Sequence, residues 1–568
     1  MLFLHRFNEN VQVIMKKEEQ FIEYVQRSIV QNWNLDALTD FNGITLQYRD
    51  VARKIAKFHI AMETAGIQPG DKIAVCGRNS AHWAVTYLAI ITYGAVAVPI
   101  LHEFKADNIH NIVNHSEAQL LFVGDQVWEN LNEEMMPLLK GIVSLLDFSL
   151  LISRSEELTY GHGHRNEIYG KRYPMNFRQE HVSYRVNTPD ELALINYTSG
   201  TTGYSKGVML TYRCILSNVL YCREMTPLKP GDKVIAILPM GHVFGMTYDF
   251  LYGIFAGVHL HFLTRVPSPK VIAYACAEIK PKLICCVPLV VEKIIKKDIL
   301  PKLDNKIGKL LLRVPILSDK LKMAARQAAI EIFGGNFDEV IVGGAPLNRE
   351  MEEFLKKIGF PFTVGYGMTE CGPLISSERW DKHKMYSCGT PAHRMTIKID
   401  SPDPANIPGE ILCKGDNLMV GYYKNPEATA QAIDEDGWLH TGDLAVMDEQ
   451  NNITIRGRKK SVLMGASGQN IYPEEIESKL NNMPYVSESL VVMQNDKIVA
   501  LIYPDFDEAF AKGLQHGDIE KAMEANRTEM NQLLPKYTQI AKVKIHFEEF
   551  EKTAKKSIKR FMYQDVRE

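Results

Sequence analysis

The sequence contains no pair of cysteines in the spacing C-x-x-C, and its nine cysteines are scattered over 568 residues. Structural zinc sites and disulfide frameworks need clustered cysteines, so the sequence argues against both. Isolated thiols are typical of a reducing compartment. The cytoplasm is therefore the expected location.

The chain also lacks an excess of charge of either sign. It has 65 lysine and arginine residues against 68 aspartate and glutamate residues, a formal net charge of −3. Nucleic-acid-binding proteins usually carry a basic excess or a basic stripe, so we expect no nucleic acid partner. With 46% hydrophobic residues, a chain of this length can bury more than one globular core.

Long uncharged runs are rare, and one of them, residues 83–101, is almost long enough to cross a bilayer. Gly94 and Pro99 interrupt it, which predicts a helix capped by Asn79 and ending at Tyr93, followed by a short buried strand. The sequence shows no signal peptide, lipidation signal or basic amphipathic helix. Peripheral association with the inner face of a membrane is therefore the most that it supports.

Short apolar strands alternate with helical segments over most of the chain, a pattern typical of parallel sheets in an α/β fold. The predicted strands are residues 72–76, 95–98, 119–123, 233–238, 282–287 and 339–342. From Ile397 onward the pattern changes to short strands with polar turns. We expect a large N-terminal domain over residues 1–456, with mostly parallel sheets flanked by helices and a small β-rich subdomain. A small α/β domain over residues 457–568 would follow it.

The most informative motif is residues 197–207, with the sequence Tyr-Thr-Ser-Gly-Thr-Thr-Gly-Tyr-Ser-Lys-Gly. Glycines let successive backbone N–H groups point inward, hydroxyls donate to anionic oxygens, and Lys206 supplies a positive charge. The loop therefore suits a polyphosphate, although its spacing does not fit a Walker A loop. The alternative is an ordinary flexible surface loop.

Three further motifs follow in order: Gly-Tyr-Gly-Met-Thr-Glu at residues 365–370, Thr-Gly-Asp at 441–443 and Gly-Arg-Lys-Lys at 457–460. Together with the loop, they resemble the adenylate-forming (AMP-binding) superfamily, and in particular its bacterial long-chain fatty acyl-CoA synthetases. The resemblance implies an ATP-dependent acid–thiol ligase. With ATP and Mg²⁺, such an enzyme converts a medium- or long-chain fatty acid to acyl-AMP and pyrophosphate. It then transfers the acyl group to CoA, while the C-terminal domain moves about a hinge near Gly457.

The resemblance also assigns residues to the nucleotide and its metal. Glu370 and Thr198 would hold Mg²⁺, since a carboxylate beside phosphates needs a cation between them. Tyr366 would stack on adenine, and Asp443 would accept hydrogen bonds from the ribose. Read singly, Glu370 could be a helix-terminal charge and Asp443 a turn residue. The residues expected to bind ATP or AMP are Thr198, Ser199, Gly200, Thr201, Thr202, Gly203, Lys206, Gly344, Ala345, Pro346, Gly365, Tyr366, Gly367, Met368, Thr369, Asp443 and Arg458.

His242 lies in the segment Leu-Pro-Met-Gly-His-Val-Phe-Gly, residues 238–245, ahead of an apolar stretch. By resemblance it lies near the acyl carboxylate, and the apolar stretch lines the channel for the chain. The alternative is an ordinary core histidine. The residues expected to bind the acyl group or CoA are His242, Val243, Phe244, Gly343, Ser467, Gly468 and Gln469.

One position departs from the family pattern. Relatives carry a lysine near the C-terminus that contacts the substrate carboxylate, and Ser557 occupies that position here. Lys555, Lys556 and Lys559 are close enough in the chain to replace it. The expected catalytic residues are Lys556, Lys559, Glu370, Thr198 and His242.

Two other functions stay open. One is a fatty acyl-AMP ligase that loads a carrier protein. The other, suggested by Ser557, is an acyl- or nucleotide-binding homologue without adenylation activity. The sequence gives no indication of the oligomeric state.

Overall fold

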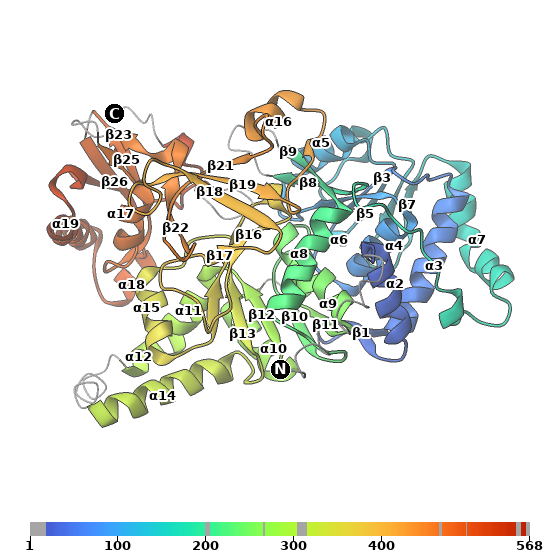
Figure 1. The fold of residues 1–568 in the computed structure, drawn as a ribbon, viewed down its shortest axis with the longest axis horizontal. Helices are drawn as coiled ribbons and strands as arrows, with labels where there is room; N and C mark the ends of the chain where they lie inside the picture. Colours follow the sequence, from blue (N-terminus) through green and yellow to red (C-terminus); the bar gives the residue numbers. More distant parts are fainter. Residues whose placement is uncertain are drawn as a thin grey trace, which may run out of the picture.

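The computed structural model describes residues 19–198, 205–264, 267–303, 315–464, 469–495, 497–552 and 558–563. Two large sheets form the body of the molecule, and the C-terminal part lies at one end of it (Figure 1). Both sheets are parallel except at their edges, where β20, β9, β7 and β2 pair in antiparallel fashion. The predicted α/β class is therefore confirmed.

The first sheet has eight strands in the order β20-β9-β8-β4-β3-β5-β6-β7. Its strands are β20 (Gly421–Tyr422), β9 (Lys206–Thr211), β8 (Leu192–Thr198), β4 (Val96–Ile100), β3 (Lys72–Cys76), β5 (Leu120–Val123), β6 (Gly141–Ser144) and β7 (Leu150–Ser153). The helices in this part of the chain include α3 (Tyr48–Thr64), α4 (Ala81–Tyr93), α5 (Ala106–Ser116), α6 (Asp125–Trp128), α7 (Glu156–Arg172) and α8 (Tyr212–Met225).

The second sheet has seven strands in the order β14-β13-β12-β10-β11-β1-β2. They are β14 (Phe362–Val364), β13 (Glu339–Val342), β12 (Leu283–Cys286), β10 (Lys233–Ala236), β11 (His259–Phe262), β1 (Asp36–Asp40) and β2 (Thr45–Gln47). The helices of this part are α2 (Phe21–Gln31), a π-helix (Gly245–Leu251), α9 (Tyr252–Ala256), α10 (Pro269–Ile279), α11 (Pro288–Asp298), α12 (Leu300–Leu303), α14 (Pro315–Ile332) and α15 (Arg349–Ile358).

Helix α4 accounts for the long uncharged run in the sequence. It contacts β3 and β4 of the first sheet and β1 of the second, and nearly all of its side chains are buried. A helix that is apolar on every face has to be covered on every face. Gly94 ends it at φ 90°, as predicted. The N-cap, however, is Ser80, whose hydroxyl accepts from Trp83 N, and the prediction of Asn79 at that position was wrong.

The β-rich part consists of two smaller antiparallel sheets. Both follow the second large sheet in the sequence. A three-stranded sheet contains β15 (Tyr366–Gly367), β16 (Leu374–Ser377) and β17 (Thr390–Pro391). A four-stranded sheet contains β18 (Met395–Asp400), β19 (Gly409–Gly415), β21 (Leu439–Met447) and β22 (Ile453–Arg458), with α16 (Pro426–Ala432) between β19 and β21 in the chain. Gly457 lies inside β22, opposite Leu444, so the chain leaves this sheet only after Arg458.

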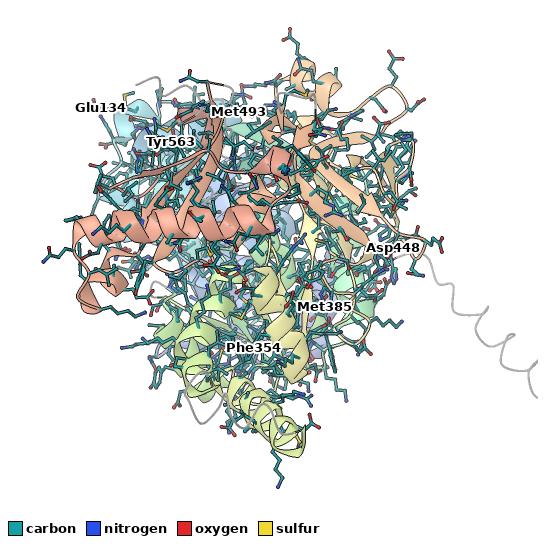
Figure 2. All side chains as sticks on the ribbon, turned by 90° about the vertical axis from the view of Figure 1, so that its left-hand side faces the viewer. Glu134, Phe354, Met385, Asp448, Met493 and Tyr563 are labelled. Carbon is teal, nitrogen blue, oxygen red and sulfur yellow. The ribbon has the colours of Figure 1, made fainter. Side chains whose placement is uncertain are left out.

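The C-terminal part has a hydrophobic core of its own, around Ile476, Val491 and Met523. Helix α19 lies on its outer face, as the side view in Figure 2 shows. Its elements are β23 (Leu463–Met464), β24 (Asn470–Ile471), α17 (Pro473–Leu480), β25 (Val486–Gln494), β26 (Lys497–Pro504), α18 (Phe506–Ala511), α19 (His516–Leu533) and β27 (Lys542–Ile545).

None of the helices in the described part of the chain has the length and apolar character that a membrane span requires.

A buried ion pair ties the end of the chain to this C-terminal core. Arg560 Nη2 lies 2.7 Å from Glu477 Oε2, and Arg560 Nη1 donates to the carbonyl of Val491 at 2.9 Å. Burial raises the pKa of Glu477, and the Arg560 charge opposes that rise. The carboxylate therefore depends on its partner to remain charged inside the protein.

Arg560→Ala should lower the free energy of unfolding on the order of 3 kcal/mol at neutral pH, because it leaves the buried Glu477 carboxyl without its ionic partner. Glu477→Gln in the same chain should recover part of the loss. Urea unfolding followed by circular dichroism measures both. Lys512→Ala removes an exposed ion pair with Glu508 in the same region, and should leave the midpoint nearly unchanged. An equal loss in Lys512→Ala would contradict the assignment.

Candidate functional site

The candidate site begins where four neighbouring strands of the second sheet end. Strands β10, β12, β13 and β14 are parallel neighbours, so their carboxyl ends lie along one edge. Ligands of α/β proteins bind at such edges. Residues 238–245 follow β10, Gly343 follows β13, and Gly365 follows β14. The fold thus brings together three segments that the sequence predicted separately.

Phe244 and Gly343 are in contact at this edge. A Cβ placed on Gly343 would lie 3.0 Å from the Phe244 ring, so only glycine lets the ring approach so closely. Val243 is buried, whereas Gly344, Ala345 and Pro346 lie exposed in the turn after Gly343. Two residues expected at the acyl site are therefore neighbours.

His242 has a defined orientation. Its Nδ1 accepts a hydrogen bond from the backbone N–H of Phe244 at 3.2 Å. A neutral imidazole that accepts at Nδ1 carries its proton on Nε2. His242 can therefore present an N–H donor to a carboxylate.

A buried asparagine holds the loop that leads to His242. Asn79 Nδ2 donates to the carbonyl of Leu238 at 2.7 Å, and Met240 N donates to Asn79 Oδ1 at 2.8 Å. This is what Asn79 does instead of capping α4. Sequence reasoning missed the role, since Asn79 is 161 residues from Met240 in the chain.

Two more buried polar side chains hold the same loop. Asn196 of β8 donates to the carbonyl of Gly241 at 2.9 Å, and Asp249 Oδ2 accepts from Leu238 N at 3.2 Å. Asp249 is fully buried in the π-helix, and burial raises its pKa to about 8. The loop, which follows β10 of the second sheet, is thus held by side chains from the first sheet and from the π-helix. No spacing in the sequence signalled either residue.

Glu370 is nearly buried and has a tyrosine partner. Tyr422 donates its hydroxyl to Glu370 Oε1 at 2.9 Å, and Lys206 Nζ lies 4.7 Å from the centre of the Tyr422 ring. Across the β8–β9 pair, Thr198 lies directly opposite Lys206. Glu370, Tyr422, Lys206 and Thr198 therefore form a connected series, in which each residue lies beside the next. The sequence predicted three of them and missed Tyr422.

The sequence-predicted residues Ser199, Gly200, Thr201, Thr202 and Gly203 lie outside the described residues, between Thr198 and Lys206.

Asp443 forms the other end of the site. Tyr366 donates its hydroxyl to Asp443 Oδ2 at 2.6 Å, and Arg458 Nε lies 2.8 Å from Asp443 Oδ1. Burial raises the pKa of Asp443, and the Arg458 charge opposes the rise. Three residues that were predicted to bind the nucleotide thus contact one another.

The segment 365–370 joins these two ends. Tyr366 reaches Asp443, and Glu370 reaches Tyr422. Between them, Met368 N donates to the carbonyl of Pro373 at 2.8 Å, and Thr369 is buried. A Cβ on Gly367 would lie 2.2 Å from the same carbonyl oxygen, which explains the glycine there.

A single carboxylate at Glu370 suits one particular kind of cation. No cluster of three or more histidine, cysteine, aspartate or glutamate side chains forms a ready-made metal site among the described residues. Mg²⁺ is usually held by one or two carboxylates together with substrate phosphates and water. The residues present therefore fit Mg²⁺ that arrives with a nucleotide.

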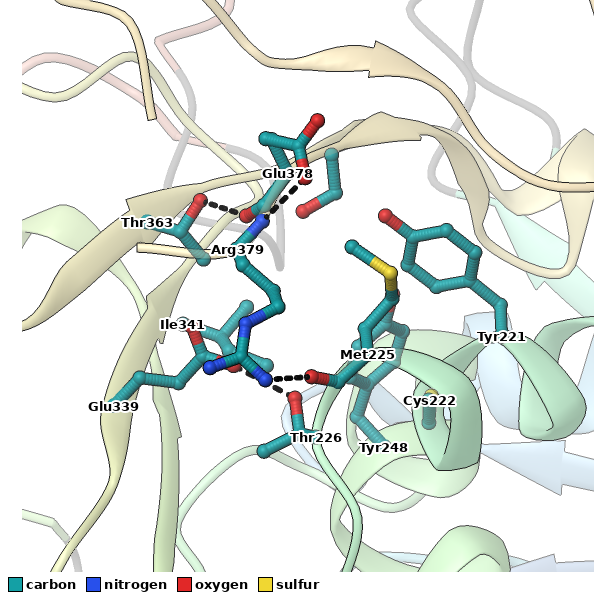
Figure 3. Close-up of a pocket in the computed structure, with 11 residues that line it drawn as sticks. Tyr221, Cys222, Met225, Thr226, Tyr248, Glu339, Ile341, Thr363, Glu378 and Arg379 are labelled. Carbon is teal, nitrogen blue, oxygen red and sulfur yellow. Dashed lines mark hydrogen bonds between the residues drawn. The ribbon is translucent and has the colours of Figure 1, made fainter. Parts of the chain in front are cut away.

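A cavity of about 10 Å³ lies beyond Phe244, large enough for about one water molecule (Figure 3). Tyr248, whose ring centre is 5.3 Å from that of Phe244, forms part of its wall. Glu339 forms another part, with Oε1 accepting from Thr226 at 2.7 Å, and burial raises its pKa. The wall of this cavity is thus partly polar. The residues of the apolar stretch Met246, Phe250, Leu251 and Ile254 belong to the main hydrophobic core.

Of the C-terminal candidates, the structure describes Gln469 and Lys559. Lys556, Ser467 and Gly468 are outside the described residues, and Gln469 is exposed. Lys559 Nζ lies 3.5 Å from Glu551 Oε2 of its own segment. Within the described ranges, no hydrogen bond or ion pair joins Lys559 to Glu370 or Asp443. The flanks of residues 553–557 meet through a bridge between Lys552 and Ile558.

The raised pKa of Asp443 predicts a pH-dependent effect of removing its charge. A carboxyl group whose pKa is higher in the folded than in the unfolded state destabilises the fold at high pH. Asp443→Asn should therefore raise the unfolding temperature of the ligand-free protein at neutral pH. The gain should disappear as the pH falls to about 3.9, the ordinary value for aspartate. Thermal scans between pH 4 and 8 measure it.

Asp448 provides a control of opposite sign. Burial acts against it, but hydrogen bonds from Lys384 and Asn452 lower its pKa overall. Asp448→Asn should therefore lower the unfolding temperature at neutral pH, with a loss that shrinks toward acid pH. A fall in the unfolding temperature of both variants would show that burial does not destabilise the protein through Asp443.

Comparisons with known proteins agree with this geometry. A family model described as AMP-binding enzyme matches residues 25–423, and one described as AMP-binding enzyme C-terminal domain matches residues 460–565. The long-chain-fatty-acid–CoA ligase FadD15 of Mycobacterium bovis is 27% identical over 491 residues, covering 81% of this chain and 77% of that protein. The chloroplastic long-chain-fatty-acid–[acyl-carrier-protein] ligase AEE15 of Arabidopsis thaliana is 26% identical, with coverage of 87% and 76%.

Among solved structures, ATP-bound MatB from Rhodopseudomonas palustris superimposes with a TM-score of 0.74 at 22% identity, covering 96% of this chain and 99% of that one. At this identity the likeness shows a shared fold. The family models, by contrast, span most of the chain, and the chain therefore belongs to the family of AMP-binding enzymes.

Proposed function

We propose that the protein is an AMP-forming fatty acyl-CoA synthetase, an ATP-dependent acid–thiol ligase. One observation carries the proposal: the segment 365–370 contacts Asp443 through Tyr366 and the Lys206–Tyr422 pair through Glu370. A nucleotide bound along this segment would have its ribose at Asp443 and its phosphates at Lys206. An acceptor for hydroxyls at one end of the segment and a cation for phosphates at the other end suit ATP.

Each side chain of the site then has a task in the first step. Asp443 accepts the ribose hydroxyls, and Arg458 keeps its carboxylate charged. Lys206 and the backbone of the loop after Thr198 neutralise the phosphates. Mg²⁺, held by Glu370 and Thr198, would offset the charge that develops on pyrophosphate as it leaves. His242 donates from Nε2 to the fatty acid carboxylate and orients it toward the α-phosphate.

The fatty acid assignment rests on the relatives and on Phe244. FadD15 is named a long-chain-fatty-acid–CoA ligase, and the contact between Phe244 and Gly343 lies next to His242, where a chain would begin. CoA would complete the second step by attacking the acyl-adenylate. Ser467, Gly468 and Gln469 are proposed to line its approach. Medium or long chains are the proposed substrates.

The second step involves the C-terminal domain. We place the domain boundary at residues 456–457 and the pivot near Gly457, so that residues 457–568 turn as a unit. Gly457 has φ 155°, and a Cβ there would lie 2.7 Å from Glu474 Oε2. The positive φ favours glycine at this position. Before this turn, during adenylation, Lys556 or Lys559 would contact the acyl carboxylate.

A carrier protein is the alternative acceptor. AEE15 is named for an acyl-carrier-protein substrate and matches 87% of this chain. A homologue that binds acyl groups or nucleotides without adenylation is the other alternative, because Ser557 cannot supply a cation.

Pyrophosphate release with ATP, Mg²⁺ and a panel of fatty acids tests these functions. We expect release that depends on the fatty acid, and thioester formation when CoA is added. Release without transfer to CoA, together with transfer to a carrier protein, would favour the alternative ligase. ATP binding without release on any acid would contradict the enzyme assignment.

The same assay identifies the replacement for the family lysine. Either Lys556→Ala or Lys559→Ala should lower the rate of acyl-AMP formation about 100-fold, which is the usual cost of losing a transition-state charge contact. Adding Ser557→Lys to the impaired variant should restore much of the rate. If both single variants and their combination retain the full rate, neither lysine is the catalytic cation.

A further inference from the structure

Tyr422 lies between two groups of opposite charge that the proposed reaction uses. Its hydroxyl donates to Glu370 Oε1 at 2.9 Å, and Lys206 Nζ lies 4.7 Å from its ring centre. Tyr422 and Glu370 are both nearly buried. One side chain therefore contacts both the carboxylate proposed for Mg²⁺ and the lysine proposed for the phosphates.

The backbone around Tyr422 is fixed. In β20, Tyr422 pairs with Val208 of β9, two residues after Lys206. Its N–H donates to Thr429 Oγ1 at 2.9 Å, and Met419 N donates to the carbonyl of Glu370 at 2.8 Å. The tyrosine and the glutamate are thus held by neighbouring backbone bonds. The Tyr422 ring is therefore held between the Glu370 carboxylate and the Lys206 ammonium group.

Both contacts of Tyr422 are interactions that are stronger in a buried site than in water. A hydroxyl that donates to a carboxylate makes a charge-assisted hydrogen bond, about twice as strong as a neutral one. An ammonium over an aromatic face is attracted by the ring quadrupole. A phenol is protonated at neutral pH, so the Tyr422 hydroxyl can donate.

We propose that Tyr422 is a positioning residue that couples the cation site to the phosphate site. Its hydroxyl fixes the orientation of the Glu370 carboxylate toward Mg²⁺, and its ring holds Lys206 ready for the nucleotide phosphates. This inference rests on the proposed ATP site, although it does not depend on which acid or thiol the enzyme uses. Groups that hydrogen-bond a metal-binding carboxylate set its orientation and affinity.

The two contacts can be separated by substitution. Tyr422→Phe removes the hydroxyl and keeps the ring, whereas Tyr422→Leu removes both. Tyr423 offers a matched control one residue along the chain. Its hydroxyl donates to Glu117 Oε2, also at 2.9 Å, and lysines lie over its ring. Tyr423→Phe therefore removes a hydrogen bond of the same kind and length at a more exposed position just after β20.

The measurement is binding rather than turnover. Mn²⁺ binding in the presence of ATP is followed by electron paramagnetic resonance of the free ion, and ATP binding without metal is followed by calorimetry in EDTA. Tyr422→Phe should weaken Mn²⁺ binding about 10-fold, as loss of a supporting hydrogen bond does at metal sites, and should leave metal-free ATP binding unchanged. Tyr422→Leu should weaken both. Tyr423→Phe should weaken neither.

A cycle with Glu370→Gln completes the test. In that background, Tyr422→Phe should change Mn²⁺ binding no further, because the hydroxyl acts through the carboxylate. Unchanged Mn²⁺ affinity in Tyr422→Phe, or an equal loss in Tyr423→Phe, would overturn the inference while leaving the ATP site intact. Absence of ATP binding in the unsubstituted protein would instead overturn the proposed function. Unfolding temperatures of all variants show whether each is folded.

Discussion

Two buried carboxylates, Asp443 and Glu370, constrain the arrangement of the whole candidate site. A charged group removed from water needs partners, and neither residue finds them in its own element. Asp443 of β21 takes Tyr366 and Arg458, and Glu370 takes Tyr422 from β20. The segment 365–370 is thereby tied to the four-stranded sheet at one end and to the eight-stranded sheet at the other. The site exists only where these two sheets meet the three-stranded sheet, which contains β15 of this segment.

The loop that carries His242 follows the same principle with neutral groups. Backbone groups that are buried outside a helix or strand must bond to side chains. Asn79 and Asn196, from the first large sheet, and Asp249, from the π-helix, supply those bonds to a loop that follows β10 of the second large sheet. His242 is therefore held in place by the packing of the two sheets. A change in the distance between the sheets would reach His242 directly.

Stability and binding oppose each other in this site. Burial disfavours the charge on Asp443, and Asp249 and Glu339 also have raised pKa values behind the acyl side. A protein selected for stability alone would not retain such groups. Active sites commonly hold charges in unfavourable places because their substrates supply the missing partners. The ribose hydroxyls would do so for Asp443 in the proposed complex.

The sequence by itself determined the α/β class, six strands of the two large sheets, the division of residues 83–101 into helix and strand, and the motifs that mark the family. These features depend on local periodicity, glycine positions and residue order. The tertiary structure alone decided that Asn79 holds the loop before His242, that Tyr422 joins Glu370 to Lys206, and that a polar cavity lies beyond Phe244. Each depends on contacts between residues far apart in the chain, where spacing carries no information. Burial then sets which polar groups need one another, and burial exists only after the sheets have packed.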